Sequence, residues 1–136
     1  MEGLARAGLF TLWLAGKPVT ASRPRFSKKG FAYTAKPYRE WLNANWKAIE
    51  AMDSVPTDRP IALLIEVGIM RPKKTAHSAP MGDTDNLSKG PMDLVTKGGK
   101  AWLDDRQIVF QATAKRWVDT EDKLGSRLWW CEVEMD

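Results

Sequence analysis

The sequence predicts a single small α/β (α+β) domain over residues 1–136, with a mixed β-sheet and two main helices. The strongest observation is an apolar segment at 61–70 that alternates as a half-buried strand does. Two stretches, at 37–52 and 83–96, have the spacing of helices, and the last third of the chain contains further strand-like runs. With 136 residues and 43% hydrophobic composition, the chain is large enough to bury one core.

The first expected strand covers residues 9–15, where Phe10, Leu12 and Leu14 share one face. This run is too short for a membrane span, which needs ~20 apolar residues, and no other stretch approaches that length. Cys131 is the one cysteine, so an intramolecular disulfide is excluded. We therefore expect a cytoplasmic protein without a membrane partner.

A first helix is expected from Pro37 to about Met52, because proline suits the first helical turn. It carries an apolar stripe with Asn45 in its middle, made of Tyr38, Trp41, Leu42, Ile49 and Met52. Core packing explains this stripe. Pairing with a second copy also explains it, because a buried asparagine can fix the register of two helices.

The segment 61–70 is expected to be a central strand. Glu66 lies on its polar face, where it can reach an acidic site or solvent. A basic loop follows at 71–82 and contains His77, the one histidine of the chain. Without a second histidine or a cysteine nearby, zinc is not expected there.

The acidic motif Asp83-Thr84-Asp85-Asn86 starts the second expected helix, which runs to about Thr96. Asp85, Lys89 and Asp93 are spaced four residues apart and so project from one side of it. Gly98-Gly99 turns the chain, and closing strands are expected at 102–105, 107–118 and 126–134.

Carboxylate oxygens are the ligands that Mg²⁺ prefers, and Mg²⁺ commonly works beside substrate phosphates. Asp83 and Asp85 flank one residue, and Asp105 could arrive on a neighbouring strand. Helix capping is the ordinary explanation of such a motif, but capping does not explain Lys89 or the later pair Asp104-Asp105.

Basic residues are segregated from this acidic motif. The window from Lys17 to Arg39 contains seven lysines and arginines and no acid, so it carries +7 while the rest of a chain of net +4 carries −3. A positive field beside an acidic site steers a polyanion toward it. Solubility alone could also explain the basic window, but the motif favours nucleic acid as the partner.

The run from Asp83 to Val109, DTDNLSKGPMDLVTKGGKAWLDDRQIV, resembles the RusA-type Holliday-junction resolvases of bacteria and phages. Their pattern is D-x-D-N-L-x-K-x-x-x-D, followed by a glycine-containing turn and an apolar-apolar-Asp-Asp segment. The basic N-terminal stretch also looks like that of phage members. This chain departs from many relatives at Gly82 and at Gly90-Pro91, and neither departure falls on an expected ligand.

The resemblance implies a RusA-like fold and a Mg²⁺-dependent endonuclease, with Mn²⁺ able to substitute. It implies that Asp83, Asp85 and Asp105 bind the metal and that Lys89 is catalytic. Three further residues, Asn86, Asp93 and Asp104, are expected to orient these groups. The DNA contacts are expected at Arg23, Arg25, Lys28, Lys29, Arg71, Lys73 and Lys74.

The expected substrate is a branched DNA, the four-way junction, cut at two equivalent strands by a homodimer. Two alternatives remain open from the sequence. One is a nuclease acting on flaps, forks or RNA, and the other is a junction-binding protein without catalytic activity.

Overall fold

The computed structural model describes residues 8–19, 25–30, 32–33, 36–74, 77–80 and 82–135. Its main body is a sheet of four strands in the order β1-β6-β4-β5. The bounds of these strands are Phe10–Ala15 for β1, Ile61–Met70 for β4, Ile108–Val118 for β5 and Gly125–Glu132 for β6. β4 is parallel to β5 and antiparallel to β6, so the predicted mixed sheet is confirmed.

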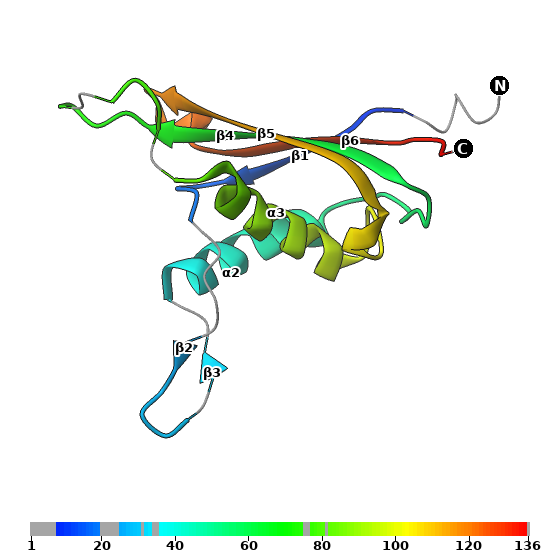
Figure 1. Cartoon of the computed structure of the whole chain (residues 1–136), viewed down its shortest axis with the longest axis horizontal. Coiled ribbons are helices and arrows are strands. Elements are labelled where there is room, and N and C mark those ends of the chain that lie inside the picture. The colour runs from blue at the N-terminus through cyan, green and yellow to red at the C-terminus, as the bar shows by residue number, and fades with distance from the viewer. Residues whose placement is uncertain are drawn as a thin grey trace.

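The central strand β4 has the residue range and the buried face that its alternating pattern predicts. Ile61, Leu63, Ile65 and Val67 are buried on one face, at 1% exposure or less. This face is covered by two helices, α2 (Lys36–Glu50) and α3 (Thr84–Gly98), which lie on the same side of the sheet (Figure 1). The hydrophobic core therefore lies between the sheet and the helix pair.

The two helices pack closely because α3 presents glycine to α2. A Cβ atom built on Gly90 would lie 3.4 Å from the Trp41 ring, and one on Gly98 would lie 2.1 Å from Ile49 Cγ2. Trp41 precedes Ile49 as Gly90 precedes Gly98, so the helices run in the same direction. α3 continues through Pro91 to its end at the left-handed residue Gly99, which has a φ of 64°.

The apolar stripe of α2 belongs to the core of its own chain. Trp41 and Ile49 are buried at 7% and 1% exposure, and Asn45 is buried at 4%. The Asn45 side chain donates to Ala15 O and Trp41 O, each at 3.1 Å. Core packing, one of the two explanations of this stripe, is therefore confirmed, since these side chains pack inside their own chain. Pairing of the helix with a second copy stays a prediction.

Two segments differ from the expected pattern. A short hairpin of β2 (Arg25–Phe26) and β3 (Ala32–Tyr33), which is not among the expected elements, lies within the basic window from Lys17 to Arg39. It extends away from the sheet beyond α2 (Figure 1). The strand expected at 102–105 is also wrong. A 3₁₀ helix, η1 (Asp105–Gln107), starts there, and η2 (Glu121–Lys123) joins β5 to β6.

Glu66 lies on the face of β4 that the helices do not cover. Its carboxylate forms an ion pair with Arg116 Nε on the neighbouring strand at 2.7 Å. Glu66 thus has a local partner and does not join the acidic motif. None of the helices in the described ranges is long and apolar enough to cross a bilayer.

Candidate active site

The acidic motif occupies the start of α3. Asp83 is the N-cap residue, with extended backbone angles of φ −78° and ψ 137°, and its carboxylate makes no capping hydrogen bond. Its carbonyl oxygen accepts from the Leu87 amide at 3.0 Å. Asp83 and Asp85 are both exposed, and Asn86 is half-buried in the same turn. The simple explanation of the motif as a helix cap therefore does not account for the Asp83 side chain.

The segment that leads into Asp83 is tied to β5. Lys115 Nζ donates to Pro80 O at 2.8 Å and to Gly82 O at 2.7 Å, and Trp117 Nε1 donates to Ser78 O at 3.2 Å. The sequence did not indicate this role for Lys115. The structure places it in register with Val67, a buried residue of β4, on a face where lysine is rarely found without a partner.

The polar side of α3 continues toward its other end. Partial burial raises the pKa of Asp93 above its ordinary value of 3.8, and the negative charge of Asp105 raises it further, while Lys97 and Lys89 oppose this shift. Lys89 is exposed and forms no ion pair with Asp85. The positive charge of Lys89 acts instead on Asp93, whose pKa it lowers.

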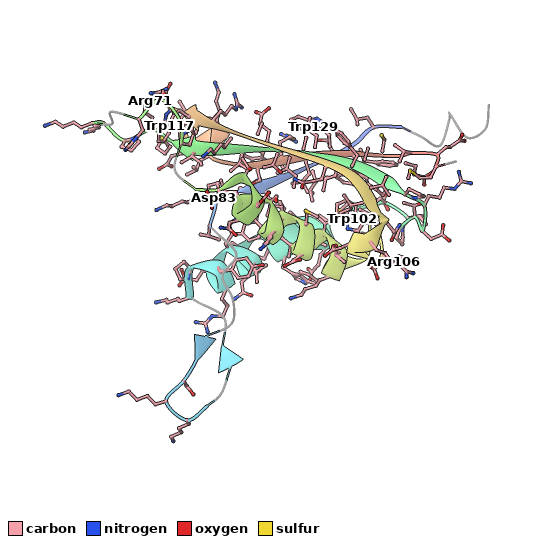
Figure 2. All side chains as sticks on the ribbon, viewed as in Figure 1. Arg71, Asp83, Trp102, Arg106, Trp117 and Trp129 are labelled. Atoms are coloured by element: carbon pink, nitrogen blue, oxygen red, sulfur yellow. The ribbon has the colours of Figure 1, made fainter. Side chains whose placement is uncertain are left out.

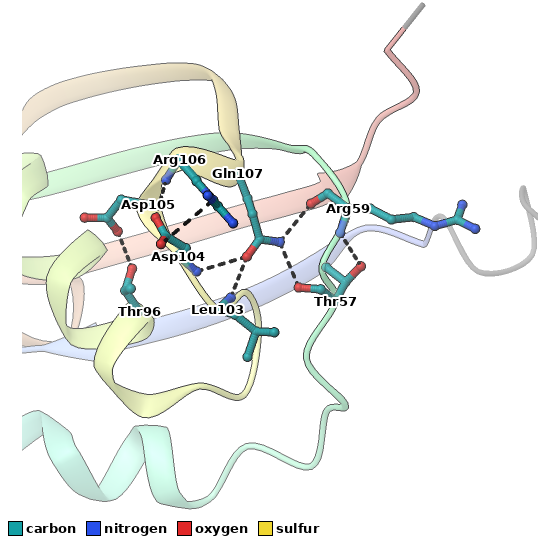
Figure 3. A network of polar contacts seen from close by, with 8 residues as sticks. All are labelled: Thr57, Arg59, Thr96, Leu103, Asp104, Asp105, Arg106 and Gln107. Carbon is teal, nitrogen blue, oxygen red and sulfur yellow. Dashed lines mark hydrogen bonds and ion pairs between the residues drawn. The ribbon is translucent and has the colours of Figure 1, made fainter.

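Asp105 is held against the last turns of α3. The Thr96 hydroxyl donates to Asp105 Oδ1 (Figure 3). The fully buried Trp102 donates from Nε1 to Thr96 Oγ1 at 2.8 Å. The position of Asp105 is thus fixed through a threonine to a tryptophan of the core.

Asp104 has a different role. Its Oδ1 accepts from the Arg106 amide at 2.9 Å, and Gln107 Oε1 accepts from the Asp104 amide at 2.9 Å, which is a capping box for η1 (Figure 3). Gln107 Nε2 also donates to Thr57 O and Arg59 O. Within this turn the Asp104 carboxylate caps η1, whereas the Asp105 carboxylate accepts from Thr96 of α3.

The three carboxylates expected to bind one metal are not gathered in the structure. Asp85 and Thr96 are eleven residues apart in α3, which at a rise of 1.5 Å per residue is about 16 Å along the helix axis. Asp105 lies beside Thr96, and Asp83 and Trp102 lie toward opposite ends of α3 (Figure 2). Across the described residues, no group of three or more His, Cys, Asp or Glu side chains is placed to hold a metal ion.

The donor chemistry suits Mg²⁺, but the spacing does not allow one ion to contact Asp83, Asp85 and Asp105 together. The structure instead divides the acidic residues into two groups. Asp83 and Asp85 lie at the start of α3, and Asp93 and Asp105 lie near its end, with Lys89 between them in the sequence of the helix.

The expected DNA contacts occupy two regions. Lys28 and Lys29 form the exposed turn of the β2–β3 hairpin, and Arg71, Lys73 and Lys74 are exposed in the loop after β4. The Arg71 guanidinium lies 5.5 Å from the centre of the Trp117 ring, close to the segment that leads into Asp83 (Figure 2). Arg23 and the side chain of Arg25 lie outside the described residues.

The comparisons with known proteins agree with the motif. The model of a protein family described as endodeoxyribonuclease RusA matches residues 15–124, which is most of the chain. A search of curated proteins found no match. The matched region contains β4, α3, η1 and β5, and so all of the acidic residues described above.

Proposed function

Because the chain belongs to the RusA endodeoxyribonuclease family, we propose that it is a Mg²⁺-dependent endonuclease that resolves four-way DNA junctions. The family match carries the nuclease assignment. Junction selectivity, paired cleavage by a homodimer and the requirement for Mg²⁺ are the parts of the proposal that go beyond this match.

Exposed acidic side chains support a hydrolytic role. Asp83 is at a capping position but leaves its carboxylate unused by the helix, and Asp85 and Asp105 are also exposed. Bound Mg²⁺ would activate water and stabilise charge on the scissile phosphate. We propose that Asp83, Asp85 and Asp105 supply Mg²⁺ ligands, Asp83 and Asp85 at the start of α3 and Asp105 near its end, with Mn²⁺ able to replace Mg²⁺. The oxygen chemistry of these residues supports this assignment, and their separation means that no single ion contacts all three in this arrangement.

Lys89 is proposed to act on the phosphate. It is exposed on α3 between the two acidic groups and makes no ion pair with Asp85. Its ammonium group can therefore neutralise the charge that develops on the phosphate oxygens in the transition state. Asn86, Asp93 and Asp104 are proposed to support these groups, Asp104 through the turn that presents Asp105.

DNA is proposed to run past both basic regions toward α3. The loop with Arg71, Lys73 and Lys74 leads directly into the segment before Asp83, and its lysines are exposed. The β2–β3 hairpin carries Lys28 and Lys29 away from the sheet, where they can reach a second duplex arm. Contacts to phosphates at two separate places favour a branched substrate over a single straight duplex.

A panel of labelled substrates tests the proposal. A mobile four-way junction, a flap, a fork and a linear duplex are each incubated with the protein in Mg²⁺, Mn²⁺ or EDTA. We expect cleavage of the junction with either metal and none in EDTA. Preferential cutting of the flap or fork would assign the nuclease a different branched substrate. Junction binding without cutting in any metal would instead indicate a binding protein.

A further inference from the structure

Lys115 occupies an unusual place in the sheet. In the β4–β5 register it pairs with Val67, and Thr113 pairs with Ile65. Val67 and Ile65 are completely buried on the helix-covered face, so Lys115 points to the same side as the core. Lys115 is half-buried there, and its N–H donors need partners because an unpaired ammonium group removed from water is costly.

Those partners are carbonyl groups of the segment before α3. Lys115 Nζ donates to Pro80 O and Gly82 O at 2.8 and 2.7 Å, and Trp117 donates to Ser78 O at 3.2 Å. The three acceptors are alternate residues of the sequence. Two side chains of β5 thus hold the described residues of this segment in place.

The contact to Gly82 O acts directly on Asp83. The Gly82 carbonyl belongs to the peptide group that joins Gly82 to Asp83. Because this group is planar, a hydrogen bond to its oxygen restricts the orientation of the whole peptide plane that precedes the Cα atom of Asp83. Gly82 has a φ of 97°, and a Cβ atom there would lie 3.3 Å from Leu87 Cδ1. Glycine therefore allows both the backbone turn and the close approach of Leu87.

Asp83 is fixed on its other side as well. Its own carbonyl oxygen accepts from the Leu87 amide at 3.0 Å. With the preceding peptide held by Lys115 and the following one by the helix, the backbone at Asp83 is constrained from both directions. The Asp83 carboxylate makes no capping hydrogen bond to the helix. The orientation of the backbone at Asp83 therefore sets the position from which its side chain extends.

We propose that Lys115 is a positioning residue for Asp83, acting through the Gly82–Asp83 peptide without contacting DNA. This inference rests on the proposed nuclease function, in which Asp83 is a catalytic carboxylate. A displacement of about 1 Å in such a group can reduce the rate by about a hundredfold.

The test compares Lys115→Met, which has a similar length but no donor, with Lys115→Arg, which can donate to two carbonyls. The single-turnover rate of junction cleavage should fall about ten- to a hundredfold in Lys115→Met. The KM from steady-state cleavage and the junction affinity measured in EDTA should both stay within about twofold of wild type. Lys115→Arg should recover most of the rate. The matched control is Lys123→Met, which removes the same charge from an exposed lysine of η2.

Hydrogen exchange gives a second readout that needs no DNA. The Leu87 amide should exchange about tenfold faster in Lys115→Met than in wild type, because its acceptor at Asp83 is no longer fixed. If Lys115→Met fails to fold, Lys115→Gln replaces it, since glutamine is one bond too short to reach both carbonyls.

A wild-type cleavage rate in Lys115→Met, or an unchanged exchange rate of the Leu87 amide in that variant, would contradict the positioning role of Lys115. Loss of junction affinity equal to the loss of rate would assign Lys115 to DNA contact instead. A wild-type protein that cuts no DNA would contradict the proposed function. The exchange measurement would still decide in that case whether Lys115 holds Asp83.

Discussion

Asp83 and Asp85 lie at the first turn of α3, while Asp105 is bound to Thr96 near its last turn. If all three serve one reaction, each is needed although they do not touch. Asp83→Asn, Asp85→Asn and Asp105→Asn should each reduce junction cleavage by at least about a hundredfold.

Junction affinity measured in EDTA should be equal or greater in these three variants, because each substitution removes a negative charge that faces the phosphates. Gel-shift titration and single-turnover cleavage of the same junction check both parts. A variant that cuts at a near-normal rate in saturating Mg²⁺ would remove that residue from the ligand set.

Lys89 should affect turnover far more than binding. Lys89→Ala removes a charge whose proposed interaction strengthens in the transition state, so the cleavage rate should fall by about a hundredfold with little change in junction affinity. Lys97→Ala is the matched control on the same helix. Weakened affinity with a normal single-turnover rate would make Lys89 a plain phosphate contact.

Asp93 links the acidic residues to stability. Its raised pKa, caused first by burial and then by Asp105, means that folding favours the protonated carboxyl group. The stability associated with that proton is present below pH 3.8 and is lost as the pH rises through the raised pKa. Asp93→Asn should therefore raise the melting temperature by at most a few degrees at pH 7 and by less near pH 4. An equal shift of the melting temperature at pH 7 and pH 4 would contradict the raised pKa of Asp93.

At the scale of elements, α2 and α3 depend on a close approach at Gly98. A Cβ atom at this position would overlap Ile49 Cγ2, and overpacking of this kind costs about 1–3 kcal/mol. We expect Gly98→Ala to lower the free energy of unfolding by that amount. Adding Ile49→Ala should relieve the overlap, so that the double variant is more stable than the two single effects predict. Changes in the free energy of unfolding that simply add in the double variant, measured by denaturant titration, would contradict a direct contact between Gly98 and Ile49.

The basic segment that contains the β2–β3 hairpin should contribute binding and no chemistry. Alanine at Arg23, Arg25, Lys28 and Lys29 together should weaken junction affinity and reduce its log–log salt dependence by about one for each lost phosphate contact. Alanine at Lys47 and Lys123, which are exposed outside the two basic regions, should change the slope less. Unchanged affinity and slope in the quadruple variant would direct attention to Arg71, Lys73 and Lys74.

Elements with a strong period were predictable from the sequence, and those set by local side-chain contacts were not. β4 and α3 follow from alternation and four-residue spacing. η1 was expected to be a strand, because the capping box between Asp104 and Gln107 competes with extended structure over a few residues only. Lys115 resembled a solvent-facing lysine, since its partners are backbone carbonyls far along the chain. The separation of Asp85 from Asp105 depends on the tertiary contact at Thr96.

For the whole molecule, the central claim is that two equivalent sites cut a four-way junction together. A supercoiled plasmid that extrudes a cruciform measures this directly, because coordinated cuts across the junction give linear DNA and a single cut gives a nicked circle. With Mg²⁺ the wild-type protein should convert the plasmid to linear product at a protein concentration where light scattering reports a homodimer, and Asp83→Asn should leave it supercoiled. Nicked circles as the main product, or linear product from a monomer, would contradict the account.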